Sequence, residues 1–257
     1  MKKGYVLITG ATSGIGYELM LLFAKDKHNL FLVSRNKEKL SLIKKDVEKK
    51  FSVDVEYLPI DLSLPESSKK VYEFAKRKNL NINILINNSG FGLGGEFVKL
   101  DIEKEEEMIN LNILALTKLT YYFLQDMKKK NKGKILNVAS LAGFLPIPYM
   151  NVYSATKSYV LSFSEALSFE LQKTNITVSA LCPGATRTNF AKVAMMDEGN
   201  FNKFSMSAKK VALIGYNGLM KGKRVIIPGS SNKLGASAIR ITPHSLLGKI
   251  LKNFNNN

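Results

Sequence analysis

The chain has 257 residues, which is enough for one α/β domain with a full hydrophobic core. Hydrophobic residues make up 45% of it, which excludes a disordered chain, and no apolar run approaches the roughly 20 residues of a membrane span. The net charge of +17 would suit nucleic acid or an anionic membrane, but the lysines are spread along the chain without a zinc-finger or RNA-recognition motif, so we expect a solvated lysine-rich surface and no nucleic-acid partner.

Short apolar, β-branched runs alternate with amphipathic stretches from the first residue to about residue 227. The hydrophobicity of the runs is continuous rather than alternating, which indicates strands that are buried on both faces. The pattern predicts an α/β fold with a doubly wound parallel sheet of about seven strands and helices on both faces. The predicted strands are 5–9, 30–34, 54–58, 83–87, 134–139, 176–181 and 223–227. The predicted helices are 14–26, 37–50, 66–78, 102–130, 151–172 and 206–220.

The first predicted strand begins almost at once, after Met1-Lys2-Lys3-Gly4. Its apolar run is too short for a signal peptide, so we expect a cytoplasmic protein without integral membrane association. The single cysteine, Cys182, excludes an internal disulfide and a cysteine-based metal cluster, and we expect no metal. Because Cys182 follows an apolar strand, a buried structural thiol is favoured over a nucleophile.

A glycine-rich turn closes the first predicted strand, and a predicted helix follows it directly. Glycine permits a tight turn and a close approach of the backbone to a diphosphate, and a helix N-terminus offers N–H groups to an anion. The spacing is Gly-x3-Gly-x-Gly rather than the commoner Gly-x-Gly-x2-Gly, and a turn without a ligand is the alternative. The residues expected to bind a dinucleotide here are Gly10, Thr12, Ser13, Gly14, Ile15 and Gly16.

The second predicted strand ends in Ser34-Arg35, with no acidic residue to bind a ribose 2′-hydroxyl and repel a 2′-phosphate. A hydroxyl and a guanidinium suit the phosphate of NADP, so we expect NADP(H) to be preferred, with NAD(H) possible. The alternative is an ordinary surface arginine ahead of Asn36, a helix cap. Asp61 and Leu62 follow the third strand and are expected at the adenine, although Asp61 could instead cap the next turn. After the fourth strand, Asn88, Ser89 and Gly90 are expected to line the adenine–ribose cleft and to tie strands together.

Tyr153 and Lys157 stand four residues apart in the predicted helix 151–172, so both side chains project from one face. Because a neighbouring ammonium favours the phenolate, we expect the pKa of Tyr153 to fall below its usual value of about 10. A hydroxyl that exchanges a proton near neutral pH is what the interconversion of a carbonyl and an alcohol needs. By itself the pair is a weak signal, because both residue types are common on helices.

Five motifs occur in order and at familiar intervals: Thr9-Gly-x3-Gly-x-Gly16, Asn87-Asn-Ser-Gly90, Ser140, Tyr153-x3-Lys157 and Pro183-Gly184. Together they resemble the short-chain dehydrogenase/reductase family of NAD(P)-dependent oxidoreductases, and the resemblance covers about residues 4–227. It implies a single Rossmann domain and a homodimer or homotetramer. Ser89 stands where the family usually has alanine, a conservative departure.

The resemblance also implies a role for each matching residue. Tyr153 would be the general acid in reduction, Lys157 would lower its pKa and hold the nicotinamide ribose, and Ser140 would donate to the substrate oxygen. Asn112 would support a water chain to the lysine, with Asn110 as the competing candidate. The segment that contacts the nicotinamide amide would include Pro183, Gly184 and Thr188.

Mainly apolar residues surround these motifs, without an arginine that could grip a carboxylate. A lipophilic ketone or aldehyde is therefore the expected small-molecule substrate, and residues 189–205 are expected to form a lid. Part of this apolar set could instead belong to the core or to a subunit interface. The expected substrate-lining residues are Leu141, Phe144, Tyr149 and Phe190 beside Ser140, with Phe91, Leu93, Met195 and Met196 as further candidates.

The expected function is thus NADP(H)-dependent interconversion of a lipophilic ketone or aldehyde and its alcohol. Keto-steroids and 3-oxoacyl groups, including those on a carrier protein, would fit, and a non-catalytic NADP-binding redox sensor is the alternative. We expect residues 1–228 to form the catalytic domain. Within the tail 229–257, apolar residues at helical spacing from Leu246 to Phe254 are expected to pack on the domain or a neighbouring subunit, with lipid contact as the alternative.

Overall fold

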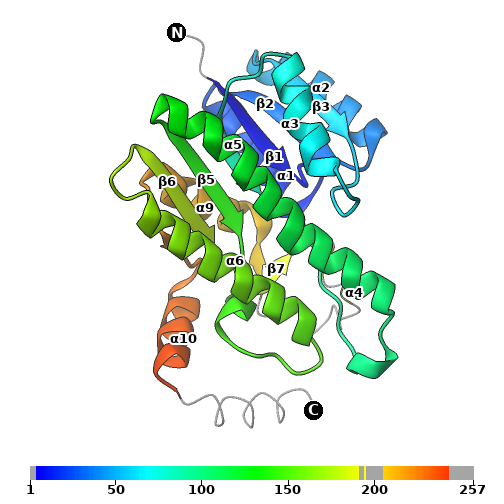
Figure 1. The fold of residues 1–257 in the computed structure, drawn as a ribbon, viewed down its shortest axis with the longest axis vertical. Coiled ribbons are helices and arrows are strands. Elements are labelled where there is room, and N and C mark those ends of the chain that lie inside the picture. The colour runs from blue at the N-terminus through cyan, green and yellow to red at the C-terminus, as the bar shows by residue number, and fades with distance from the viewer. Residues whose placement is uncertain (1–3, 191–193, 195–204, 243–257) are drawn as a thin grey trace.

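The computed structural model describes residues 4–190, 194 and 205–242. Seven parallel strands form one sheet in the order β3-β2-β1-β4-β5-β6-β9 (Figure 1). The strand order reverses between β1 and β4, and ligands of doubly wound sheets bind at such a switch point. The strands are β1 (Tyr5–Thr9), β2 (Asn29–Ser34), β3 (Val55–Pro59), β4 (Ile82–Asn87), β5 (Gly133–Val138), β6 (Ile176–Leu181) and β9 (Val225–Ile226).

Helices cover both faces of the sheet, as predicted, because neighbouring residues of each buried strand point to opposite faces. In β1, Val6 and Ile8 pack against α1, α2 and α9, whereas Leu7 packs against α3, α5 and α6. Figure 1 shows α5 and α6 in front of the sheet and α9 behind it. The helices are α1 (Gly14–Lys25), α2 (Lys37–Phe51), α3 (Ser67–Arg77), α4 (Ile102–Ile109), α5 (Leu116–Lys130), α6 (Asn151–Glu170), α9 (Ala208–Met220) and α10 (Ser230–Ile241).

The predicted helix 102–130 is helical throughout, but it is not one regular α-helix. Between α4 and α5, the π-helical segment η2 (Asn110–Ala115) widens the winding. Sequence periodicity does not distinguish such a wide turn from an α-helical one, and π segments inside helices occur frequently at functional sites. Two short 3₁₀ helices, η1 (Phe97–Lys99) and η3 (Leu141–Phe144), follow β4 and β5.

The C-terminal part differs more from the prediction. Only Val225–Ile226 of the predicted strand 223–227 pair with β6. The predicted helix 206–220 begins at Ala208, because Met206–Ser207 form strand β8, which pairs with β7 (Thr186–Arg187). A helix not predicted from the sequence, α10, occupies the start of the tail, while the apolar pattern from 246 to 254 lies outside the described residues.

Buried amides connect the two central strands to the helices in front of them. Asn87 on β4 donates to Asn137 Oδ1 on β5 (2.8 Å) and to Thr120 Oγ1 on α5 (3.0 Å). Asn137 in turn donates to Ser164 Oγ on α6 (2.9 Å). Such a buried network fixes the register of strands and helices, because each missing bond would leave a desolvated polar group. In the described part of the chain, no helix is long and apolar enough to cross a bilayer.

One buried carboxyl group lies outside any such network. The side chain of Glu105, on α4, is only 2% exposed, and its Oε2 has no hydrogen-bond partner among the described residues. Burial raises the pKa of Glu105, because desolvation penalises the charged form. The carboxyl group therefore costs stability at its position two turns before Asn112.

We predict that Glu105→Leu stabilises the fold by about 1–3 kcal/mol at pH 7, because it removes an unpaired buried polar group. The folded-state pKa of Glu105 is raised, so the unfolded chain releases this proton first as pH rises and wild-type stability falls. The advantage of the variant should therefore be larger at pH 7.5 than at pH 5, measured by urea unfolding. The exposed neighbour supplies the control, since Glu106→Leu should change stability little. A less stable leucine variant would contradict the prediction.

Candidate active site

The glycine-rich turn after β1 has the conformation that the sequence predicts. Gly10 and Gly14 have φ angles of +65° and +56°, which favour glycine. A Cβ atom on Gly16 would lie 2.4 Å from the carbonyl oxygen of Gly10, so only glycine fits there. α1 starts at Gly14, and the side chain of its N-cap Ser13 makes no capping bond to the helix amides. The turn and helix end therefore fit a bound diphosphate.

Thr9 and Asn88 hold this turn against the end of β4. Thr9 Oγ1 accepts from the backbone N–H groups of Asn88 and Ser89, both at 2.9 Å. The Asn88 amide donates to the carbonyl oxygens of Thr9 (3.0 Å) and Gly10 (3.2 Å). The tie between strands that the sequence predicts is present. Both of these amide bonds go to the turn itself, so Asn88 shapes the cofactor cleft through the backbone.

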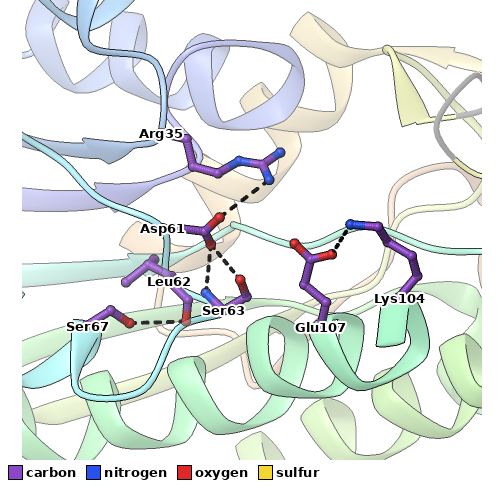
Figure 2. Close-up of polar contacts among 7 residues, drawn as sticks. All are labelled: Arg35, Asp61, Leu62, Ser63, Ser67, Lys104 and Glu107. Carbon is purple, nitrogen blue, oxygen red and sulfur yellow. Dashed lines mark hydrogen bonds and ion pairs between the residues drawn. The ribbon is translucent and has the colours of Figure 1, made fainter. Parts of the chain in front are cut away.

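At the end of β2, the Arg35 guanidinium lies 3.6 Å from Asp61 Oδ2 (Figure 2). Asp61 Oδ1 also accepts from Ser63, from its N–H at 2.9 Å and its hydroxyl at 2.6 Å. Burial raises the pKa of Asp61, but these bonds and the Arg35 charge outweigh it, so the pKa lies below its usual value. Asp61 therefore caps its turn, as the alternative interpretation expected, and also holds Arg35.

Two other residues assigned to the adenosine end have protein partners. The hydroxyls of Thr12 and Ser34 lie 3.0 Å apart, which joins the glycine turn to the end of β2. Leu62 is 5% exposed and packs in the core under α3 and α5, so its side chain belongs to the hydrophobic interior. A direct contact of Leu62 with the cofactor stays a prediction.

Asn112 lies in the π-helical segment and faces inward. Its Oδ1 accepts from the N–H of Phe91 (3.2 Å), and its Nδ2 donates to Phe91 O (2.9 Å) and Thr156 Oγ1 (3.1 Å). It is 1% exposed, whereas its competitor Asn110 is half-buried. This placement favours Asn112 over Asn110, because only Asn112 bonds to the loop after β4 and to α6.

The ammonium of Lys157 is buried beside Asn112. Its Nζ donates to the carbonyl oxygen of Val138 at 3.0 Å, and the residue is 6% exposed. A Cβ atom on Gly90 would lie 2.8 Å from Asn112 Oδ1 and 3.4 Å from Lys157 Nζ, so glycine leaves the space that both groups occupy. Burial lowers the pKa of Lys157 to about 8.

We expected the pKa of Tyr153 to be lowered, and this prediction was wrong. Burial raises the pKa of Tyr153 to about 12, and a hydrogen bond with Ser140 lowers it only in part. The ammonium of Lys157 lies 5.7 Å from the centre of the Tyr153 ring and donates to Val138 O instead of to the phenol. The phenol therefore carries its proton at neutral pH, which is the state that a general acid requires.

Ser140 follows β5 and faces the segment after β6. Its Oγ accepts from the N–H of Ala142 (3.1 Å) and lies 3.5 Å from the carbonyl oxygen of Pro183. The N–H of Leu141 also donates to Pro183 O, at 2.9 Å. Pro183 thus anchors the turn that presents Ser140 to Tyr153, and Cys182 just before it is fully buried, as expected.

The segment after β6 lies across the glycine turn. A Cβ atom on Gly14 would lie 3.0 Å from the methyl group of Thr188. A Cβ atom on Gly184 would lie 2.8 Å from the amide of Asn232, so this glycine faces α10. The segment from Pro183 to Thr188, which is predicted to contact the nicotinamide, therefore runs from α10 to the glycine-rich turn after β1.

The structure places the expected substrate-lining residues in different surroundings. Phe190 and Phe91 pack in a cluster with Tyr153, and the rings of Tyr153 and Phe190 are 5.3 Å apart. Leu141 packs near Gly184, and Tyr149 is 43% exposed, with a φ of +63°. Phe144 instead packs with Val225 and Ile227 in a different cluster from that of Tyr153. Met195 and Met196, and most of the expected lid 189–205, lie outside the described residues.

Sequence reasoning missed three supporting groups: the Thr9 hydroxyl, the Thr156 hydroxyl and the Val138 carbonyl. Thr9 begins the glycine motif and Thr156 lies within Tyr153-x3-Lys157, and those positions were the available signal. No residue type could have indicated Val138, because the acceptor is a backbone oxygen.

We predict that Lys157→Met removes a pH-dependent part of the stability. Below pH 8 the folded protein holds a buried charge, whereas the unfolded lysine stays protonated up to about pH 10.5. The unfolded state therefore binds more protons between these values, so wild-type stability should rise by about 1.4 kcal/mol per pH unit relative to the variant. Urea unfolding at pH 8, 9 and 10 measures this slope, with Lys128→Met as the exposed control. Parallel profiles for wild type and Lys157→Met would refute the burial cost.

Comparison with known proteins places these features in a family. The family model described as short chain dehydrogenase matches residues 4–199. A human very-long-chain 3-oxoacyl-CoA reductase is 33% identical over 214 residues, which cover 80% of this chain and 67% of the human protein. A 7beta-hydroxysteroid dehydrogenase from Mediterraneibacter gnavus is 30% identical over 182 residues, 71% of this chain and 68% of that protein.

Comparison with solved structures supports the same family. A short-chain dehydrogenase from Sphingobium yanoikuyae in complex with NADPH superimposes with a TM-score of 0.84 at 34% identity, covering 91% of this chain and 92% of that one. The bulky-bulky ketone specific alcohol dehydrogenase from Comamonas testosteroni gives 0.80 at 29% identity, with 93% of each chain covered. This chain therefore belongs to the short-chain dehydrogenase/reductase family, the NAD(P)-dependent oxidoreductases that act on CH–OH groups.

Proposed function

We propose that the protein is an NADP(H)-dependent reductase of a lipophilic ketone or aldehyde, with Tyr153 as the general acid. The observation that carries the proposal is the buried phenol of Tyr153, hydrogen-bonded to Ser140 and enclosed by apolar side chains. A carbonyl group seated here would meet two hydroxyl donors, and the developing alkoxide would receive the phenolic proton. NADPH, when bound, supplies the hydride.

The remaining polar groups position the acid and restore its proton. Lys157, whose pKa burial lowers to about 8, can carry or release a proton near neutral pH. Asn112 bonds to the loop after β4 and to Thr156 of α6, which fixes the helix that carries the lysine and tyrosine against that loop. These contacts support roles for both residues in proton supply rather than in contact with the substrate.

The preference for NADP(H) is supported by the end of β2. Arg35 is 72% exposed there and offers a guanidinium, while the nearby carboxylate of Asp61 is engaged by Ser63 and by Arg35 itself. A 2′-phosphate would thus meet a cation, and the carboxylate that usually selects a free 2′-hydroxyl is missing from β2. The glycine turn fits the diphosphate of either cofactor.

The substrate class is supported by the walls around Tyr153. Buried Met108, Met150 and Ala142 line its cluster together with the half-buried rings of Phe91 and Phe190. Such a lining favours an apolar body next to the reacting carbonyl. The relatives named for 3-oxoacyl-CoA and 7beta-hydroxysteroid substrates act on compounds of this kind. We therefore propose a 3-oxoacyl thioester or a keto-steroid as the first substrates to test.

We predict that the protein oxidises NADPH in the presence of such ketones and that Tyr153→Phe lowers kcat about 10²–10⁴-fold, because it removes the proton donor. Loss of NADPH absorbance with a panel of 3-oxoacyl thioesters, keto-steroids and simple aldehydes measures the rate. The phenylalanine variant should still bind NADPH, which is the control for folding. A wild type that binds NADPH tightly but reduces no carbonyl would instead favour a redox sensor.

We predict that Arg35→Ala lowers kcat/KM with NADPH by about 10-fold and changes kcat/KM with NADH little, because the guanidinium meets only the 2′-phosphate. Steady-state kinetics with both cofactors and one ketone make the measurement. An equal loss with the two cofactors would show that Arg35 acts on the shared part of the dinucleotide or on the fold.

A further inference from the structure

A second cation stands opposite Arg35. Lys104 lies in the first part of α4, and its ammonium donates to Glu107 Oε2 at 2.6 Å. Figure 2 shows both side chains rising from the helix on the side that faces Asp61 and Arg35. Neither Lys104 nor Glu107 belongs to a motif that the sequence pattern singled out.

The charges of Lys104 and Glu107 on α4 and of Arg35 after β2 influence one another. Glu107 raises the pKa of Lys104, and the Arg35 guanidinium is close enough to oppose that shift. The end of β2 and the start of α4 therefore carry two cations that are close enough to repel each other, each paired with a carboxylate. An anion placed between them would relieve this repulsion.

Both ion pairs can open at low cost. The side chains of Lys104 and Arg35 are 57% and 72% exposed, and exposed pairs contribute little to stability. Arg35 lies 3.6 Å from Asp61, which is longer than a strong charge-assisted hydrogen bond of about 2.8 Å. Asp61 therefore does not hold Arg35 firmly, and the shorter Lys104–Glu107 bond lies where solvent reaches the ammonium.

We propose that Lys104 is a second determinant of cofactor specificity, and that its ammonium and the Arg35 guanidinium bind the ribose 2′-phosphate of NADP(H) from opposite sides. The inference rests on the proposed preference for NADP(H). A phosphate monoester carries close to two negative charges at neutral pH, whereas Arg35 supplies one positive charge. Lys104 supplies the other, and Glu107 holds it in place until the phosphate binds.

The test uses nucleotide fragments, so it does not depend on turnover. Titration calorimetry compares adenosine 2′,5′-bisphosphate with adenosine 5′-monophosphate, which lacks only the 2′-phosphate. Lys104→Met should weaken binding of the bisphosphate by about 10-fold and binding of the monophosphate by less than about 2-fold. Lys104→Arg should keep most of the affinity for the bisphosphate, because it retains the charge.

The matched control is Lys99→Met. Lys99 is also exposed and also pairs with a glutamate three residues away, at 2.5 Å from Glu96 Oε2. It should leave both affinities unchanged. Glu107→Gln, which releases Lys104, should strengthen binding of the bisphosphate by about 2- to 5-fold.

The outcomes separate this inference from the proposed function. A wild type that prefers the bisphosphate, with Lys104→Met unchanged in that preference, would overturn the role of Lys104 and leave the NADP(H) proposal standing. Equal affinity of the wild type for both fragments would overturn both. An equal loss of affinity for the two fragments in Lys104→Met would also refute the inference, because the lysine would then act on the shared part of the nucleotide.

Discussion

The site depends on an ammonium group that the fold removes almost entirely from water. Desolvation of Lys157 is unfavourable, and its charge is tolerated because the Val138 carbonyl accepts from it and Gly90 leaves it space beside Asn112. These three supports come from three different parts of the chain: β5, the loop after β4 and the π-helical segment. The lysine therefore reaches its position only when β4, β5, the π-helical segment and α6 have packed together.

Backbone groups and buried amide side chains hold these strands and helices together. Asn87 and Asn137 fix β4 and β5 against the helices in front of them, and Thr9 and Asn88 fix the glycine turn to β4. Apolar residues on both faces of the strands supply most of the stability, while these polar ties set the register. The glycine turn after β1 and the proton donor Tyr153 are thereby both held at the carboxyl ends of the parallel strands.

Much of the fold could be predicted, because strand–helix alternation and glycine spacing are local signals. The seven parallel strands of the sheet and the helices on both of its faces agree with the prediction. The deviations have tertiary causes. Only two residues of β9 find partners on β6, and η2 widens where Asn112 bonds to Phe91 and Thr156. The glycine and serine at the start of α10 concealed a helix whose Asn232 packs against Gly184.

The sequence by itself determined the family, the dinucleotide turn and the residues of the catalytic motif, because these depend on residue type and spacing along the chain. Only the tertiary structure decided whether a pKa is raised or lowered and which charged groups lie close together. Spacing on a helix predicted a lowered pKa for Tyr153, whereas burial raises it and Lys157 turns to a carbonyl oxygen. Likewise, Lys104 and Arg35 are 69 positions apart in the sequence, and only the folded chain brings them close enough for their charges to act on each other. Burial and the distance between charges are properties of the folded chain, and no local pattern encodes them.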